Sequence, residues 1–216
     1  MGQKVNPHLI RLQNTHTWSS RWFSDKNYKE TVLEDYKLRK LLMERLGRAG
    51  ISSVEIERSI NNVRIIVNVS RPGVVIGRAG VGIEELKKVI HQFFQSVGKT
   101  GKMMPRFDLR VEQIQDPNLD AYLVAKNIAE GLTRRLSFKR VLVQTSERVM
   151  SSGGLGVRVL LSGRINGAEI GRREKIQVGT VPLSTIRANI DYAQYPALTK
   201  KGYIGIKVWI NRAEEK

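Results

Sequence analysis

The sequence predicts an α+β protein of two domains that follow a short N-terminal arm. Three observations support this prediction. Helical apolar spacing opens each half of the chain, and strand-like alternation of apolar and polar residues follows it. A turn and helix-cap signal beginning at Asp116 separates the halves. We therefore expect a basic arm over residues 1–17, a first domain over 18–115 and a second domain over 116–216.

The net charge of the chain points to a polyanionic partner. Lys and Arg number 37 against 20 acidic residues, which gives a formal net charge of +17. Such an excess repels itself in a folded protein and is usually tolerated because a polyanion neutralises it. The hydrophobic fraction of 41% is sufficient for packed cores. No apolar run reaches the roughly 18 residues that cross a bilayer, so nucleic acid is expected rather than a membrane.

Several classes of chemistry are excluded by missing residues. The chain has no cysteine, which removes disulfides, thiol nucleophiles and cysteine metal sites and fits a reducing cytoplasm. Residues 98–100 (GKT) resemble the end of a phosphate-binding loop, but Phe93 stands where that motif needs glycine. The histidines His8, His16 and His91 are scattered along the chain. We expect no catalytic site, metal, cofactor or small-molecule substrate.

The first domain is expected to contain a three-stranded sheet with helices on one face. Asp25 or Asn27 can cap its first helix. Trp18, Trp22 and Phe23 lie just before that helix and either stack on bases or anchor the arm to it. The expected elements are a helix ending near Gly47, strands over 54–57 and 63–69, a short apolar segment over 74–76, a helix over 83–94 and a strand over 107–112.

The most informative segment is Gly77-Arg78-Ala79-Gly80, between two expected helices. Glycine at both ends allows a sharp turn and a close approach of a nucleic-acid backbone. The N–H groups that begin the next helix favour phosphate, and Arg78 adds a charged donor. GxxG alone also fits a tight loop between packed helices. The surrounding order of elements, however, is that of a type II KH domain, whose GxxG loop clamps about four nucleotides of RNA.

The second domain is expected to consist of two helices followed by a mostly antiparallel four-stranded sheet. The turn over 116–118 offers a cap for its first helix. Trp209 alternates with a buried row and lies either at the surface or at an interface. The expected elements are a helix from about Leu119 to Leu136, a helix over 138–149, and strands over 157–161, 168–177, 186–190 and 204–210.

Basic residues of the second domain form further candidates for RNA contact. One cluster lies at the junction of the two helices of this domain and has few acids nearby, which favours phosphate contact over a merely solvated surface. It consists of Arg134, Arg135, Lys139 and Arg140. Two further groups either contact RNA or are simply exposed. One lies around the turns at Gly163 and Gly167 and consists of Arg164, Arg172, Arg173 and Lys175, and the other is Lys200 and Lys201 in a loop. The expected RNA-binding residues are Gly77, Arg78, Ala79, Gly80, Arg134, Arg135, Lys139, Arg140, Arg164, Arg172, Arg173 and Lys175, with Lys4 and Arg11 in the arm.

Over almost its whole length the chain resembles the bacterial type of small-subunit ribosomal protein number three. The resemblance rests on MGQKVNPHLIRL, RPGVVIGRAGVGIEELKK, SGRINGAEIGRREKIQVGTVPLSTIRANIDY and GYIGIKVWI, in that order. It implies a type II KH domain followed by the family's α+β C-terminal domain. It further implies a place in the head of the small subunit of the cytoplasmic ribosome, bound to small-subunit rRNA, with small-subunit proteins ten and fourteen as neighbours.

The resemblance also implies contact with mRNA. Family members line the channel through which mRNA enters and aid the passage of structured mRNA, and the matching basic positions here are Lys139 and Arg140. One turn later, where the family usually has another basic residue, this chain has Val143. The interior of the GxxG loop is often doubly basic in the family, whereas here it is Arg78-Ala79.

Two other functions compete with the ribosomal one. A free KH-type regulator or RNA chaperone would explain the GxxG loop and the charge, but it does not explain the second domain. An RNA-processing enzyme would need a metal-ligand cluster, a nucleophile with its base, or a nucleotide loop, and the sequence has none of these motifs.

Overall fold

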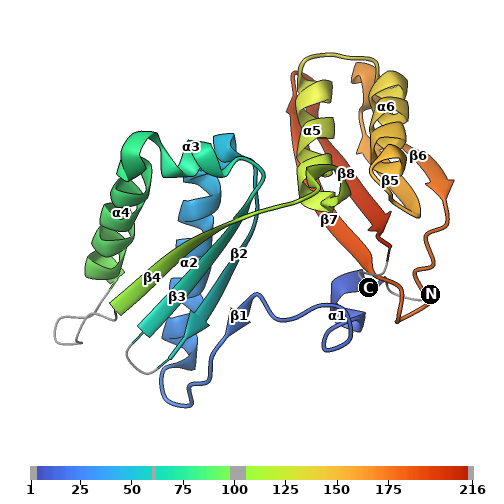
Figure 1. The fold of residues 1–216 in the computed structure, drawn as a ribbon. Coiled ribbons are helices and arrows are strands. Elements are labelled where there is room, and N and C mark those ends of the chain that lie inside the picture. The colour runs from blue at the N-terminus through green and yellow to red at the C-terminus, as the bar shows by residue number, and fades with distance from the viewer. Residues whose placement is uncertain (1–3, 60–61, 98–105, 214–216) are drawn as a thin grey trace. The chain divides into compact units, whose positions relative to one another are not determined.

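The computed structural model describes residues 4–59, 62–97 and 106–213, and its chain divides into two compact units. One unit comprises residues 18–115. The other comprises residues 116–216 together with residues 1–17 (Figure 1). The arm therefore belongs to the C-terminal unit, and the first domain is inserted between the two parts of that unit in the sequence.

The sheet of the first unit has four strands, one more than predicted. The strands are β1 (Ser20–Arg21), β2 (Ile51–Arg58), β3 (Asn62–Val69) and β4 (Arg106–Gln113), in the order β1-β2-β3-β4. The β2–β3 pair is antiparallel, and β3–β4 and β1–β2 are parallel. The extra strand β1 has only two residues, which is too short to produce a period-two pattern in the sequence.

Helices cover one face of this sheet, as predicted. The buried residues of β3 are alternate ones, from Val63 to Val69, so a single face carries the core. Leu38 and Leu42 of one helix and Ile90 of another complete that core. The helices are α2 (Tyr28–Arg45), α3 (Pro72–Ile76) and α4 (Val81–Val97), with short 3-10 turns at Gly47–Ala49 and Arg78–Gly80. The predicted order, with a short helix before the GxxG loop, is confirmed.

Trp22 anchors the segment before α2 to that helix. Its indole N–H donates to the buried carboxylate of Asp35 at 2.7 Å, and Arg58 donates to the same carboxylate at 2.8 Å. Trp18 and Phe23, in contrast, are exposed, with Phe23 at 86%. Of the two interpretations of these aromatics, anchoring therefore holds for Trp22.

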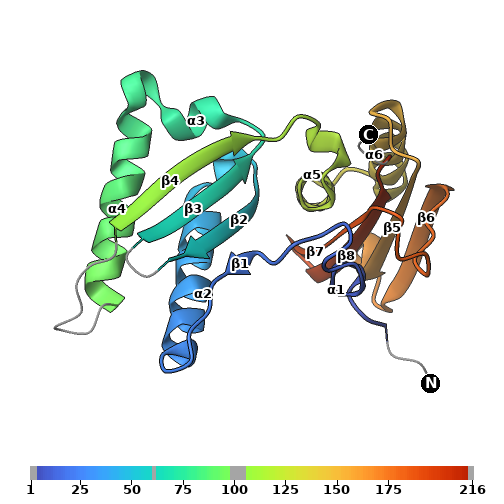
Figure 2. The ribbon, with the colours of Figure 1, turned by 60° about the horizontal axis from the view of Figure 1, so that its bottom comes forward.

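The second unit packs two helices on one face of an antiparallel sheet, as Figure 2 shows from below. The sheet order is β6-β5-β8-β7, and every neighbouring pair is antiparallel. Trp209 is buried in this unit, so the prediction that it lies at the surface or at an interface is wrong. The elements are α5 (Ala121–Thr133), α6 (Phe138–Ser151), β5 (Gly156–Gly163), β6 (Arg172–Gly179), β7 (Ile190–Thr199) and β8 (Gly202–Asn211), with 3-10 turns at Pro117–Leu119 and Ile165–Gly167.

Several predicted boundaries in this unit are wrong. The first helix begins later than predicted because Asp120 caps it, accepting a hydrogen bond from the Leu123 N–H at 2.9 Å. That helix ends at Thr133, so Leu136 lies beyond it and is 49% exposed rather than buried. Strand β6 starts at Arg172, four residues after the predicted 168, because its partner strand β5 ends at Gly163, which pairs with Arg172.

The third strand of the sheet begins only at Ile190, whereas the sequence predicts it over 186–190. The residues before Ile190 alternate like a strand, yet their carbonyls do not enter a ladder. The carbonyls of Pro182, Leu183, Thr185 and Ala188 instead accept hydrogen bonds from the guanidinium of Arg11. A long-range side chain thus replaces the strand partner that the local pattern suggests.

The N-terminal arm is more regular than the sequence predicts. It contains a short helix, α1 (Pro7–Ile10), which Asn6 caps through its side chain and which contacts β7. Within the described ranges, no helix is both long enough and apolar enough to cross a membrane.

Candidate nucleic-acid interface

The GxxG loop has the tight backbone that the motif predicts. Gly77 and Gly80 have φ values of +70° and +82°, which favour glycine. A Cβ on Gly77 would lie 3.0 Å from the N of Gly82, and a Cβ on Gly82 would lie 2.4 Å from the carbonyl oxygen of Val75. Gly82 was not among the predicted site residues, yet it lets α4 start directly against α3. Arg78 is exposed at this turn, where α4 begins.

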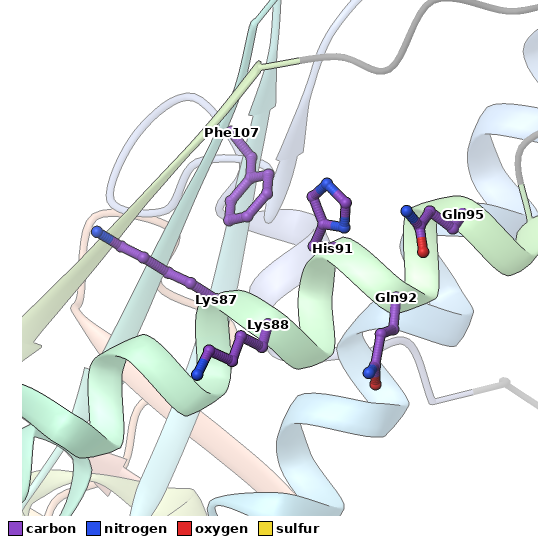
Figure 3. Close-up of a pocket in the computed structure, with 6 residues that line it drawn as sticks. All are labelled: Lys87, Lys88, His91, Gln92, Gln95 and Phe107. Carbon is purple, nitrogen blue, oxygen red and sulfur yellow. The ribbon is translucent and has the colours of Figure 1, made fainter.

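A groove lies beside the loop-bearing helix, between α4 and strand β4. It has a volume of about 450 Å³ and is lined by Lys87, Lys88, His91, Gln92, Gln95 and Phe107. In Figure 3 the rings of Phe107 and His91 lie next to each other in this groove. No acidic residue is among the described residues that line it. Cationic and aromatic side chains in one groove can hold a phosphate and stack a base.

A larger groove in the second unit unites three of the predicted basic clusters. Its volume is about 1080 Å³. Arg135 and Arg164 come from separate predicted clusters, and Lys200 and Lys201 come from the loop between β7 and β8. We call it the basic groove; it is lined by Leu132, Thr133, Arg135, Leu136, Ser137, Arg164, Asn166, Gly167, Leu198, Thr199, Lys200, Lys201 and Ile204.

Two turns with unusual backbone conformations shape the basic groove. Arg135 has a φ of +61° in the turn between α5 and α6, and Asn166 has a φ of +56° in the turn after β5. Both lie in the left-handed region, which is uncommon for residues other than glycine. Arg164 ties the second of these turns to the loop between β7 and β8, because it donates to the carbonyl of Ala168 at 2.8 Å and to that of Lys201 at 3.5 Å. The Asn166-Gly167 pair is the one sequence signal that marks such a turn.

The other predicted basic residues of this unit lie outside that groove. Lys139 and Arg140 are exposed on the first turn of α6. The guanidinium of Arg172, on β6, lies 5.8 Å from the centre of the Phe138 ring, which brings it to the same end of α6. Arg134 is exposed and lies 3.9 Å from the carboxylate of Glu130. The β6 residues Arg173 and Lys175 belong to an edge strand of the sheet.

Arg11 must be removed from the expected RNA-binding set. Its side chain is fully buried, with 0% of the residue exposed. Nε and the two terminal nitrogens donate to main-chain carbonyls, among them that of Pro7 at 3.1 Å. Arg11 therefore holds the C-terminal unit together instead of facing an RNA ligand. Lys4 is exposed, and its contact with RNA stays a prediction.

An acidic residue at the start of β7 ties the arm to the C-terminal unit. Asp191 contacts His8 Nε2 at 3.1 Å, accepts the Ala121 N–H at 2.8 Å and pairs with Arg212. Burial alone would raise the pKa of Asp191, but the hydrogen bond with His8 and the charge of Arg212 lower it to about 2. Burial also lowers the pKa of His16, whose ring lies against that of His8. Within the described ranges, no cluster of three or more His, Cys, Asp or Glu residues offers a metal site.

Comparison with known proteins supports both halves of this description. Residues 37–118 match the KH domain family, and residues 128–210 match the family described as ribosomal protein S3, C-terminal domain. Proteins named small ribosomal subunit protein uS3 from Syntrophomonas wolfei, Lactobacillus acidophilus and Finegoldia magna are 43%, 44% and 45% identical to the chain. Each alignment covers 99% of this chain, and it covers 90%, 92% and 84% of those proteins respectively. With identity of this level along nearly its whole length, the chain belongs to the uS3 family of small ribosomal subunit proteins.

Proposed function

We propose that the chain binds small-subunit rRNA as a structural component of the head of the small ribosomal subunit. Membership in the uS3 family carries this proposal, because its relatives are named as proteins of the small ribosomal subunit. The geometry supports it: an exposed Arg78 lies in the GxxG turn, and the second unit has a basic groove with no acid among its described lining residues. A net charge of +17 is typical of a protein whose partner is a polyanion of this kind.

The finer part of the proposal concerns mRNA. The exposed residues Lys139 and Arg140 on α6 contact mRNA at the channel through which it enters, and they aid the passage of structured messages. Their side chains act passively, by holding single strands through phosphate contacts while the ribosome moves. This assignment rests on the match of these positions to the family and on their exposure on a helix with few compensating acids.

Protein neighbours of the proposed complex are small-subunit proteins ten and fourteen, as the resemblance implies. Exposed apolar side chains on the first unit support a protein contact of this kind. Phe23, Tyr28 and Tyr36 are exposed before and along α2, at 86%, 63% and 62%. Large aromatic side chains are enriched at protein interfaces, where their burial contributes to binding.

Sedimentation of a lysate that contains the tagged protein tests the proposal. Subunits are dissociated, and the fractions are compared at low and high salt. We expect the chain to stay with small subunits through the high-salt wash, because an assembled structural protein is held by many contacts. Migration as a free protein would instead favour the alternative, a KH-type regulator or RNA chaperone whose target crosslinking would have to identify.

A further inference from the structure

We propose that the basic groove of the C-terminal unit is a pocket for one unstacked nucleotide of an RNA strand, with the adjoining phosphate held by Arg135 and Lys201. The inference rests on the proposed RNA-binding function and adds a specific site to it. It gives the groove a binding role that is separate from those of the GxxG loop and the exposed helix α6.

The charge of the groove selects an anion. Four of its lining residues are basic, and its described lining includes no acid. Glu130, whose carboxylate lies 3.9 Å from Arg134, is outside the lining, as is Arg134 itself. The positive charges of Arg135, Lys200 and Lys201 are therefore not offset by an acid in the described lining, and a phosphate would be attracted to them.

The rest of the lining selects a ligand with a flat apolar part. Leu136 and Leu198 supply apolar surface between the basic residues, and the core residues Leu132 and Ile204 also line the groove. Leu136 and Leu198 are exposed at 49% and 59%, so this surface is not used up by the core. Ser137 and Asn166 offer hydroxyl and amide groups to a base edge or a ribose. The hydroxyls of Thr133 and Thr199 donate to the carbonyls of Ala129 and Gly202, so they can only accept from a ligand. Inorganic phosphate would leave the apolar part unused.

The geometry of the groove is set before any ligand binds. Arg164 is fixed by hydrogen bonds to the carbonyls of Ala168 and Lys201, so its planar guanidinium is held in the wall of the groove. An ordered guanidinium plane is a surface on which a base stacks. Arg135 and Asn166 adopt left-handed backbone conformations at two borders of the groove. Residues held in such conformations by the surrounding fold are frequent at ligand sites.

The volume distinguishes this site from a flat phosphate-binding surface. At about 1080 Å³ the groove is slightly larger than the range of roughly 300–1,000 Å³ that small-molecule pockets occupy. A nucleotide and its flanking phosphate therefore fit, whereas a double helix does not enter a pocket of this size. Splaying out single bases is how proteins commonly read RNA loops and bulges.

The test is methyl NMR of the full-length chain labelled at Leu and Ile, titrated with a 5′-phosphorylated tetrauridylate. We expect saturable shifts of the methyl groups of Leu132, Leu136, Leu198 and Ile204. Uridine monophosphate and inorganic phosphate are titrated separately. Tenfold or more weaker binding of the monophosphate assigns the site to an RNA strand, whereas equal binding overturns that assignment in favour of a free nucleotide.

Variants make the test specific to the groove. Arg135→Gly with Lys201→Ala should weaken tetrauridylate binding at these methyl groups tenfold or more, and glycine adopts the backbone conformation of Arg135 without strain. The matched control, Arg148→Ala with Lys207→Ala, removes two charges from the same unit outside the groove and should change affinity less than twofold. Equal reductions in affinity for the two variants would show that only net charge matters and would overturn the inference.

RNA binding in the basic groove and association with small subunits are measured separately, so either can fail alone. Tetrauridylate binding that shifts no groove methyl group, in a protein that still associates with small subunits, overturns the groove alone. In the background Arg78→Asp with Ala79→Asp, we expect the groove methyl groups to shift as before, because the GxxG loop belongs to the other unit. Absence of the groove shifts in that background would show that the ligand is held by the KH domain instead.

Discussion

The Nε of Arg11 donates to the main-chain carbonyl of Ala188 at 2.8 Å, across 177 residues of sequence. Arg11, the residue after α1, also donates to the carbonyls of Pro182, Leu183 and Thr185. These hydrogen bonds take the place of strand pairing in the segment before β7. The whole first domain lies between the two residues in the sequence. The arm is therefore an integral part of the C-terminal unit, and that unit is complete only when the segment before the first domain packs against the segment after it.

Arg11→Ala is expected to destabilise the C-terminal unit by about 3 kcal/mol, because it leaves several part-buried carbonyls without a donor. Calorimetry should show a lower unfolding temperature for the C-terminal unit, while the transition of the KH domain stays unchanged. Lys4→Ala, at an exposed position of the same arm, is the control and should have no measurable effect. Equal unfolding temperatures for Arg11→Ala and the unsubstituted chain would contradict the structural role of Arg11.

The lowered pKa of Asp191 makes the folding stability of the chain depend on pH. Its pKa is about 2 in the folded chain against 3.8 normally, so the carboxylate contributes about 2 kcal/mol of folding free energy. Since the folded pKa is the lower one, this contribution is complete above about pH 4 and disappears as the pH falls through 2. Asp191→Asn should lower stability at pH 6 and flatten its dependence between pH 4 and 2. Denaturant unfolding at a series of pH values measures this, and parallel curves for both proteins would refute the assignment.

The GxxG loop predicts a defect in RNA binding without unfolding. Arg78→Asp with Ala79→Asp should weaken binding of single-stranded RNA, since it places negative charge where the loop meets phosphate. The slope of log affinity against log salt should fall by about 0.7 for each phosphate that the loop no longer neutralises. Lys29→Asp with Asn27→Asp makes the same change in charge at the start of α2, where acids are tolerated. Identical affinities for the two variants would argue against a working KH loop.

We expect substitutions on α6 to change the translation rate of structured messages only. Lys139→Ala with Arg140→Ala should leave subunit assembly intact but slow translation of messages with stable hairpins. Val143 is 47% exposed and lies one turn after Lys139, so Val143→Lys should fold normally and speed the passage of the same messages. Translation rates on structured and unstructured reporters provide the measurement. If both variants changed the two rates equally, a role of α6 in holding mRNA would be refuted.

Local patterns were sufficient to predict much of the fold. The alternation from Val63 to Val69 marks a strand with one buried face, and Gly77 with Gly80 marks the turn before α4. Both signals depend only on neighbouring residues. The order of the KH elements and the four-stranded C-terminal sheet are confirmed for that reason.

Features that depend on distant partners could not be predicted in this way. Arg11 resembles any other basic arm residue in sequence, and only the folded chain shows that it is buried against the segment before β7. The predicted start of β7 is wrong for the same reason. The basic groove needs three turns to meet around Arg164, and the left-handed backbone of Arg135 has no sequence signal at all. Such sites arise from tertiary packing rather than from periodicity.

We expect the chain to be a resident component of the small ribosomal subunit. The most direct test is the amount of tagged chain per molecule of small-subunit rRNA, measured by quantitative mass spectrometry in salt-washed small subunits. One copy per rRNA molecule is the result that a structural component requires. A ratio far below one, with most of the chain recovered outside the subunits, would contradict the claim.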